Sequence, residues 1–206
     1  MYRHIFWDMG GTLIDTYPQL DATFAEVVRG RGHDVSIEHV ASLTRESTAH
    51  AVSTLAGEFD IEPSAFEAAN AALKKAWRLD PAPVMPGAPE LMDKVRAAGG
   101  LNLVVTHRDR ISADALVRAL GLRIDDLVSA SDGFPRKPAP DMHLRLVEEH
   151  TLDVDECLAV GDRPIDAAAA AAAGMDAVLL ASAFADRASG VRTVASLAEL
   201  MEEVAS

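Results

Sequence analysis

The feature that most constrains the fold is an alternation of short apolar segments with segments of helical periodicity, which begins near residue 86. Strands buried on both faces read as continuous apolar runs, and parallel strands need a crossover connection, usually a helix. The alternation therefore predicts an α/β fold, with a parallel sheet between two layers of helices. The expected strands are 5–7, 101–105, 127–129, 157–160 and 177–180, and the expected helices are 87–98, 111–120, 139–150, 164–173 and 195–205.

Residues 17–80 break this alternation, because their apolar side chains recur at helical spacing and no strand-like run occurs among them. The expected helices are about 18–31, 36–57 with a break, and 63–78, and the proline-rich stretch 80–83 ends the pattern. We therefore expect a core domain of residues 1–14 and 82–206, with a small all-helical domain, residues 15–81, inserted after the first strand.

The composition excludes several classes of partner. The 206 residues carry a formal charge of -13 without a cluster of Lys and Arg, which disfavours nucleic acid. The one cysteine, Cys157, lies in an expected strand, which is typical of a buried thiol in a reducing compartment. No signal peptide and no apolar run of about 18 residues is found. We expect a cytoplasmic protein without a membrane partner, and the sequence leaves the oligomeric state open.

The first expected strand runs directly into a carboxylate. Asp8 follows the apolar residues 5–7, and Gly10 and Gly11 allow the backbone to turn sharply and approach a ligand. In open parallel sheets, ligands bind at the carboxyl ends of the strands, where Asp8 is expected to lie. Asp8 could instead cap an ordinary turn, since Asp and Gly are common turn residues.

Polar residues also follow the other expected strands. The strand at 101–105 is followed by Thr106, the strand near 128 leads to Lys137, and the strand at 157–160 leads to Asp162 and Asp166. The carboxyl ends of parallel strands lie at one edge, so these groups should converge on Asp8. This set suits phosphoryl transfer, in which Asp8 attacks phosphorus and Lys137 and Thr106 orient the phosphoryl oxygens. Three carboxylates, Asp8, Asp162 and Asp166, suit Mg²⁺.

These motifs, in this order, resemble the haloacid dehalogenase superfamily, in its phosphatase-type branch of phosphoglycolate phosphatase-like and β-phosphoglucomutase-like proteins. The resemblance covers essentially the whole chain. Its four motifs are residues 8–13, Thr106, Lys137 and residues 161–166. It implies a Rossmann-like core, a helical cap at about 15–81 that closes over the substrate, Mg²⁺ dependence, and a small phosphorylated metabolite as substrate.

The resemblance also implies roles for single residues. The metal ligands would be Asp8, Asp162, Asp166 and the backbone carbonyl of Gly10, while Gly11 and Thr12 would contact the substrate. His107 and Arg108 beside the second motif, and Arg45 in the cap, are further candidates for substrate contact. The other six histidines show no ligand spacing, and we expect them on the surface or on cap helices: His4, His33, His39, His50, His143 and His150.

The sequence departs from the family at Gly10. Phosphatases of the family carry a second Asp there as general acid and base, and glycine cannot transfer a proton. A positioned acid or base raises the rate typically 10²–10⁴-fold, which corresponds to about 3–5 kcal/mol in the activation barrier. Its loss would therefore slow the reaction most for substrates that already react slowly. His107, Asp15 or Asp109 could replace it.

Three alternatives therefore remain beside a phosphatase acting through Asp8. The chain could be a phosphate-binding or regulatory protein that kept the metal site without turnover. A phosphonatase-like C–P hydrolase would need a cap lysine that forms an imine, but Arg45 occupies the suggestive early position, and the cap lysines, Lys74 and Lys75, come late. A dehalogenase-like enzyme would usually lack the two-Asp fourth motif.

Overall fold

A computed structural model describes residues 1–181 and 190–205. The chain divides into two compact units, residues 1–14 with 83–206 and residues 15–82. We call the first the sheet unit and the second the helical unit. Within the described residues, no helix has both the length and the apolar character needed to cross a membrane.

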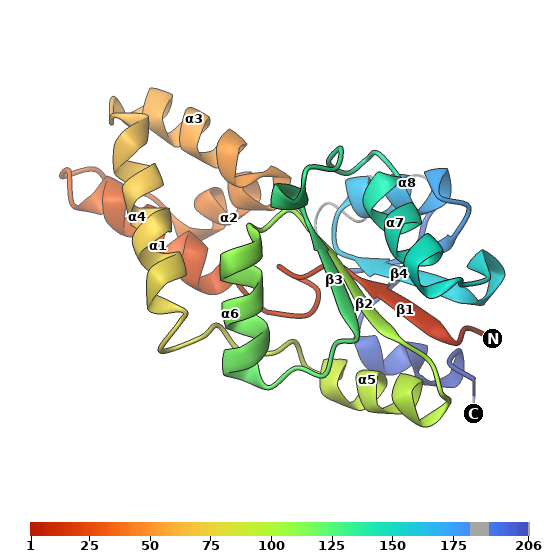
Figure 1. The fold of residues 1–206 in the computed structure, drawn as a ribbon. Coiled ribbons are helices and arrows are strands. Elements are labelled where there is room, and N and C mark those ends of the chain that lie inside the picture. The colour runs from red at the N-terminus through yellow and green to blue at the C-terminus, as the bar shows by residue number, and fades with distance from the viewer. Residues whose placement is uncertain (182–189, 206) are drawn as a thin grey trace. The chain divides into compact units, whose positions relative to one another are not determined.

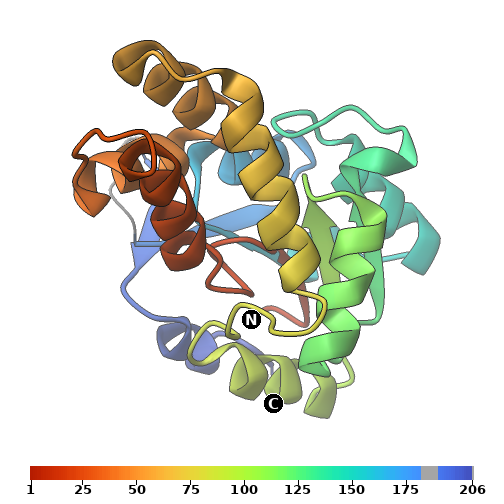
Figure 2. The ribbon, with the colours of Figure 1, turned by 90° about the vertical axis from the view of Figure 1, so that its left-hand side faces the viewer.

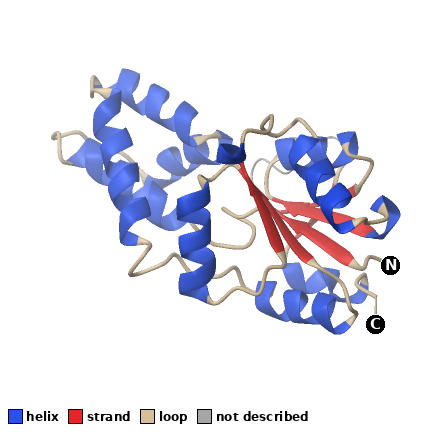
Figure 3. Cartoon of the chain, viewed as in Figure 1, coloured by secondary structure: helices blue, strands red, loops and turns tan. Residues whose placement is uncertain are grey.

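The sheet unit is built on six parallel strands (Figures 1 and 3). Their order across the sheet is β3-β2-β1-β4-β5-β6. This confirms the expected α/β fold with a parallel sheet. The strands are β1 (His4–Trp7), β2 (Asn102–Thr106), β3 (Asp126–Ser129), β4 (Cys157–Gly161), β5 (Asp176–Leu180) and β6 (Arg192–Val194).

Helices cover both faces of this sheet (Figure 1). On one face, apolar side chains of the central strands, such as Phe6 and Val105, pack against Met142 of α7 and Ala170 of α8. Helix α5 and the C-terminal 3₁₀ helix η4 lie together on the other face. The helices of the sheet unit are α5 (Ala88–Ala97), α6 (Arg110–Leu120), η1 (Ala130–Asp132), α7 (Asp141–His150), η2 (Val154–Glu156), α8 (Pro164–Ala172) and η4 (Leu197–Glu202).

The strand order reverses direction beside β1. From β1 the chain builds β2 and β3 toward one edge, then returns to place β4 on the other side of β1. Asp8 N donates to Val160 O at 2.8 Å, which aligns the carboxyl ends of β1 and β4. Ligand sites of open α/β sheets lie at such a reversal, so the fold itself favours this position.

The helices of the helical unit are drawn in red to yellow in Figure 2. This unit has its own hydrophobic core. Phe24 of α1 packs edge-on against Phe66 of α4, with ring centroids 5.4 Å apart. The expected break in 36–57 lies at Ser47, whose extended backbone ends one helix and whose hydroxyl accepts from His50 N to begin the next. The four helices are α1 (Tyr17–Arg29), α2 (Ile37–Glu46), α3 (Thr48–Phe59) and α4 (Pro63–Ala76).

The expected C-terminal helix 195–205 is wrong, because the structure has only the 3₁₀ segment η4, preceded by the unexpected strand β6. Leu197 and Leu200 lie three residues apart and are both buried, which suits the three-residue turn of a 3₁₀ helix. Beyond η4, Ala205 N donates to Tyr2 O at 2.8 Å, so the chain end pairs with the N-terminal segment instead of continuing as a helix.

Two of the histidines expected on the surface or on cap helices are buried in the sheet unit. His4 is the first residue of β1, and its Nδ1 accepts from Leu101 N at 3.2 Å. His143 lies on the side of α7 that faces the sheet, and its ring stacks on Phe6 with centroids 5.9 Å apart. The spacing of these histidines in the sequence did not indicate a metal site, and it carries no information on whether a side chain is buried. Cys157 is buried as a free thiol, as expected.

Candidate active site

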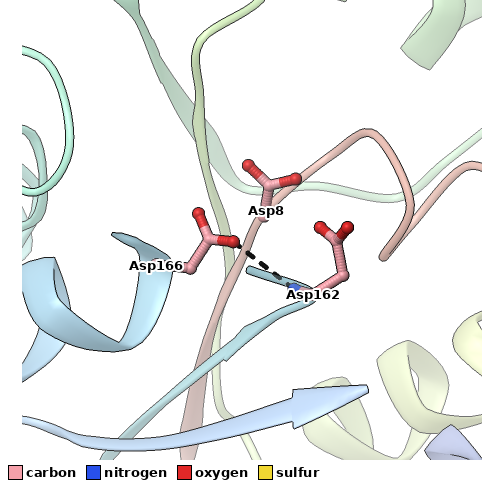
Figure 4. A group of neighbouring side chains, drawn as sticks. All are labelled: Asp8, Asp162 and Asp166. Carbon is pink, nitrogen blue, oxygen red and sulfur yellow. Dashed lines mark hydrogen bonds between the residues drawn. The ribbon is translucent and has the colours of Figure 1, made fainter. Parts of the chain in front are cut away.

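Three carboxylates meet at the carboxyl ends of β1 and β4 (Figure 4). Asp8 directly follows β1, Asp162 directly follows β4, and Asp166 lies in the first turn of α8. All three are buried, and one carboxylate oxygen from each lies within 4.8 Å of the others. The structure thus brings together the three acidic residues that the sequence singled out.

Asp166 is held at the start of α8 by backbone donors. Its Oδ2 accepts from Arg163 N at 3.0 Å and from Asp162 N at 3.4 Å, and the second of these bonds is drawn in Figure 4. Gly161 makes room for this arrangement, because a Cβ at that position would lie 2.4 Å from Cβ of Asp166. A glycine at residue 161 is therefore a steric requirement of the site.

Lys137 lies among the carboxylates and is itself buried. Its Nζ is 2.5 Å from Asp8 Oδ1 and 2.6 Å from Asp166 Oδ1, and it donates to Val105 O at 3.0 Å. One ammonium thus forms ion pairs with two carboxylates that come from different elements. Lys137 lies in the segment between η1 and α7, and its peptide bond to Pro138 is cis.

Burial and these ion pairs have opposite effects on the ionisation of the cluster. Burial raises the pKa of Asp8, and the adjacent Lys137 ammonium offsets part of that rise. For Asp166, burial is outweighed by the charges of Lys137 and Arg163, which hold its pKa below the usual value. The two carboxylates in turn raise the pKa of Lys137 despite its burial. Lys137 is therefore a fixed positive charge beside Asp8.

The turn after β1 positions Thr12 against the cluster. Gly11 adopts a φ of 86°, which favours glycine, and the amides of Leu13 and Ile14 both donate to Met9 O. The Thr12 hydroxyl donates to Asp162 Oδ1 at 3.3 Å. The side chain of Thr12 thus orients a carboxylate of the cluster, while its expected contact with substrate remains a prediction.

The loop after β2 carries Thr106, His107 and Arg108. The buried Thr106 hydroxyl accepts from Arg108 N at 3.1 Å, and Arg108 Nη1 donates to Ser112 Oγ at 3.1 Å. Burial lowers the pKa of Arg108 to about 10, opposed by the charges of Asp109 and Asp8. Arg108 is therefore cationic at neutral pH and acts electrostatically on Asp8.

His107 is the only candidate imidazole among the predicted site residues. Burial, together with the charges of Lys137, Arg136 and Arg163, lowers its pKa to about 4. Its Nε2 is buried and, among the described residues, has no hydrogen-bond partner. At neutral pH the imidazole of His107 is therefore uncharged, with a proton on one of its two ring nitrogens.

Asp109 and Arg45, both proposed for the site, have partners of their own. Asp109, suggested as a replacement acid, is exposed and accepts from Ser112 N at 2.9 Å as the N-cap of α6. Arg45 belongs to the helical unit, where its Nη1 lies 2.7 Å from Asp21 Oδ2 and its guanidinium lies 4.0 Å from the centre of the Tyr17 ring. Asp15 also belongs to that unit.

The sequence analysis missed the residues that hold the loop after β2 in place. The hydroxyl of Ser129, the last residue of β3, is buried and donates to Arg108 O at 2.9 Å. Asp132 accepts from Ser129 N at 2.8 Å and forms an ion pair with Arg110. The polar residues within 129–132 at a strand end were the available signal, but nothing in their spacing connects them with the loop after β2.

The residues present fit a small divalent cation. Oxygen ligands of Mg²⁺ lie about 2.0–2.1 Å from the ion, so two of them are at most about 4 Å apart. The three carboxylate oxygens within 4.8 Å are close to this spacing, and carboxylates are the ligands that such ions prefer. Three buried carboxylates share one cluster with the ammonium of Lys137, so a bound cation would help to balance their negative charge.

Comparison with known proteins agrees with this geometry. A family model described as haloacid dehalogenase-like hydrolase matches residues 2–174, which include every side chain of the carboxylate cluster. The chain belongs to the haloacid dehalogenase-like hydrolase family. The expected family is thereby confirmed.

Two curated relatives of this hydrolase match over most of their length. Fructose-1-phosphate phosphatase YqaB of Escherichia coli (strain K12) is 30% identical over 184 residues, which cover 86% of this chain and 95% of that protein. A phosphoglycolate phosphatase of Rhodobacter capsulatus is 30% identical over 185 residues, covering 85% of this chain and 82% of that protein.

Solved structures of the family share the fold. A hydrolase from Streptococcus pneumoniae TIGR4 is 29% identical with a TM-score of 0.70, covering 88% of this chain and 94% of that chain. A family hydrolase from Deinococcus radiodurans R1, solved with bound phosphate and sodium, has a TM-score of 0.80 at 21% identity, covering 97% of this chain and 93% of that chain.

Proposed function

We propose that this hydrolase is a Mg²⁺-dependent phosphatase that acts on a small phosphorylated metabolite through an aspartyl phosphate on Asp8. The observation that carries the proposal is the contact of one buried lysine, Lys137, with both Asp8 and Asp166 at the strand-order reversal. A nucleophile beside a fixed cation and two further carboxylates is an arrangement that suits phosphoryl transfer. Relatives named as phosphatases support the reaction class.

In this mechanism Asp8 attacks phosphorus with a carboxylate oxygen. Lys137 favours the ionised form of that carboxylate, and then neutralises charge on the phosphoryl oxygens together with the Thr106 hydroxyl. Gly11 and Thr12 would contact the substrate from the turn after β1. Water then releases phosphate from Asp8 and restores the free carboxylate.

The metal would be held by the side chains of Asp8, Asp162 and Asp166 and by the backbone carbonyl of Gly10. A bound Mg²⁺ supplies positive charge that lets a phosphate approach three carboxylates and polarises its oxygens. Thr12 holds the carboxylate of Asp162, and the backbone donors of residues 162 and 163 hold the carboxylate of Asp166.

Substrate selection would involve His107 and Arg108 in the sheet unit and Arg45 in the helical unit, which we propose acts as a cap. Guanidinium groups pair with phosphate or carboxylate through two parallel hydrogen bonds. Arg45 is held by Asp21 and Tyr17, so its guanidinium is preorganised. Arginine does not form the imine that a phosphonatase-like reaction needs, and this reaction is therefore the weaker candidate.

The test is hydrolysis of p-nitrophenyl phosphate with and without Mg²⁺, by the wild-type protein and by Asp8→Asn. We expect turnover that requires Mg²⁺, and at least a 10³-fold loss in the variant because the nucleophile is removed (about 4 kcal/mol in the barrier). Turnover that is indifferent to both the metal and the substitution would exclude this mechanism.

Gly10 specifically favours a second candidate, a phosphate-binding or regulatory protein without turnover. Such a protein would bind Mg²⁺ and phosphate ligands in calorimetry and would hydrolyse none of a broad panel of phosphate esters. Any turnover that Asp8→Asn abolishes would exclude it.

A further inference from the structure

The carboxylate cluster contains no group that is available to protonate a leaving group. Residue 10 is glycine and has no side chain. Asp162 and Asp166 lie with Asp8 in one buried cluster, and Lys137 forms ion pairs with two of the three. These charged groups are therefore committed to one another or to a cation.

The loop after β2 supplies Asp109 and His107 as candidate proton donors, and neither is suited to donate a proton. Asp109 is exposed and accepts the hydrogen bond from Ser112 N that caps α6. His107, with a pKa lowered to about 4, is a neutral imidazole at neutral pH. It can accept a proton, but only a small fraction of the protein carries the protonated form that a general acid needs.

Positive charge, in contrast, is concentrated beside Asp8. Lys137 is in direct contact with Asp8. Arg163, in the turn between β4 and α8, and Arg108, in the loop after β2, also act electrostatically on it. A leaving group that departs as an anion is stabilised by such cations without any proton transfer.

We propose that this site acts on acyl phosphates, the mixed anhydrides of a carboxylic acid and phosphoric acid. The inference rests on the proposed phosphatase function and specifies its substrate class. An alkyl phosphate must expel a strongly basic alkoxide, which needs a proton as it leaves. An acyl phosphate expels a carboxylate, which is a weak base and is also a good partner for guanidinium groups.

The reaction balances without an acid. A carboxylate oxygen of Asp8 forms a bond to phosphorus while the bond from phosphorus to the acyl oxygen breaks, and the electron pair of that bond leaves on the carboxylate. Water then attacks phosphorus, the bond to Asp8 breaks, and phosphate is released. The proton lost by the water passes to solvent.

The experiment compares acetyl phosphate with ethyl phosphate, which have the same number of carbon atoms, at saturating Mg²⁺. Spontaneous hydrolysis is subtracted. For the wild-type protein we expect kcat/KM to be at least about 10³-fold higher for acetyl phosphate than for ethyl phosphate. The reason is that only the ethoxide leaving group needs a general acid. Gly10→Asp should raise kcat/KM for ethyl phosphate at least tenfold and so reduce this ratio. The matched control is Gly10→Asn, which has the same shape as Gly10→Asp without an acidic proton and should not raise kcat/KM for ethyl phosphate.

The outcomes separate this inference from the proposed function. Turnover of ethyl phosphate within tenfold of acetyl phosphate, with both reactions abolished by Asp8→Asn, overturns the acyl phosphate assignment and leaves the phosphatase in place. Absence of any turnover that depends on Mg²⁺ and Asp8 overturns both. If Gly10→Asp does not fold, the wild-type ratio still decides the assignment.

Discussion

Lys137 is the residue whose ammonium forms ion pairs with two carboxylates of the candidate active site. It is buried between Asp8 and Asp166, so Lys137→Met would leave two carboxylates without their direct counter-ion. We expect turnover to fall by about 10²–10³, as for loss of one transition-state donor. We also expect the free energy of unfolding to fall by roughly 3–5 kcal/mol without metal, because a buried ion pair is broken.

Mg²⁺ binding tests the role of Lys137 more directly than turnover does, again with the variant Lys137→Met. Removing a positive charge from the cluster should tighten Mg²⁺ binding in calorimetry, and Mg²⁺ should therefore raise the unfolding temperature more in Lys137→Met than in the wild type. The control is Lys75→Met on the exposed side of α4. Weaker Mg²⁺ binding in Lys137→Met would contradict the placement of the cation among these carboxylates.

His143 is a buried histidine that should make the stability of the protein depend on pH. Burial lowers its pKa to about 3, with a further contribution from Lys137. The unfolded chain binds this proton below about pH 6.5 while the folded protein does not, so stability is full above pH 6.5 and falls as the pH drops toward 3. The expected loss is roughly 1 kcal/mol per pH unit.

His143→Phe should reduce this loss, because phenylalanine keeps the ring that packs on Phe6 and does not bind a proton. Urea unfolding at pH 7 and pH 5.5 measures the difference. His33→Gln, at an exposed position of the helical unit, is the control. An unchanged slope of stability against pH in His143→Phe would show that the imidazole is protonated equally in both states.

The junction of β4 with α8 positions two of the proposed metal ligands, Asp162 and Asp166. Gly161→Ala would place a methyl group 2.4 Å from Cβ and 2.8 Å from Oδ2 of Asp166. We expect Asp166 to be displaced, with Mg²⁺ affinity at least tenfold weaker and stability lower by about 1–3 kcal/mol. Calorimetry with Mg²⁺ measures the first effect.

A second glycine provides the matched control for this junction. A Cβ at Gly57, in α3 of the helical unit, meets nothing within 4 Å. Gly57→Ala should stabilise the protein by up to about 1 kcal/mol and leave Mg²⁺ binding unchanged. Equal Mg²⁺ affinity in Gly161→Ala and the wild type would show that Asp166 does not need this glycine.

The strands of the sheet were predictable where an apolar run was long enough to signal burial. Strands β1 to β5 each carry such a run, and the polar residues that follow β1 to β4 predicted the position of the site. Strand β6 was missed because Arg192-Thr193-Val194 lies at the edge of the sheet with two exposed side chains, and so has no apolar run.

The residues that support the site were less predictable than the residues that form it. Asp8 and Lys137 are chemically conspicuous at strand ends, so sequence alone singled them out. Ser129 and His143 act through a hydrogen bond to the Arg108 carbonyl and through packing on Phe6, respectively. Contacts of this kind join residues distant in the chain, and neither periodicity nor motif spacing reports them.

At the scale of the whole molecule, the helical unit is an insertion whose two ends meet. Ile14 pairs with Val84, and Met85 N donates to Leu13 O at 2.9 Å, so residues that flank the insertion are already hydrogen-bonded within the sheet unit. Each unit also has its own hydrophobic core. Replacing residues 15–82 by a short glycine linker should therefore leave a sheet unit that folds.

We expect this shortened protein to unfold cooperatively in circular dichroism and to bind Mg²⁺ within about tenfold of the intact protein, because all four proposed ligand residues belong to the sheet unit. It should still hydrolyse p-nitrophenyl phosphate in an Asp8-dependent way. Discrimination among phosphorylated metabolites should be lost, since Arg45 is removed with the helical unit. Arg45→Ala in the intact chain is the matched variant, because it removes the guanidinium and keeps the unit. A shortened protein that folds but no longer binds Mg²⁺ would show that the helical unit contributes to the metal site.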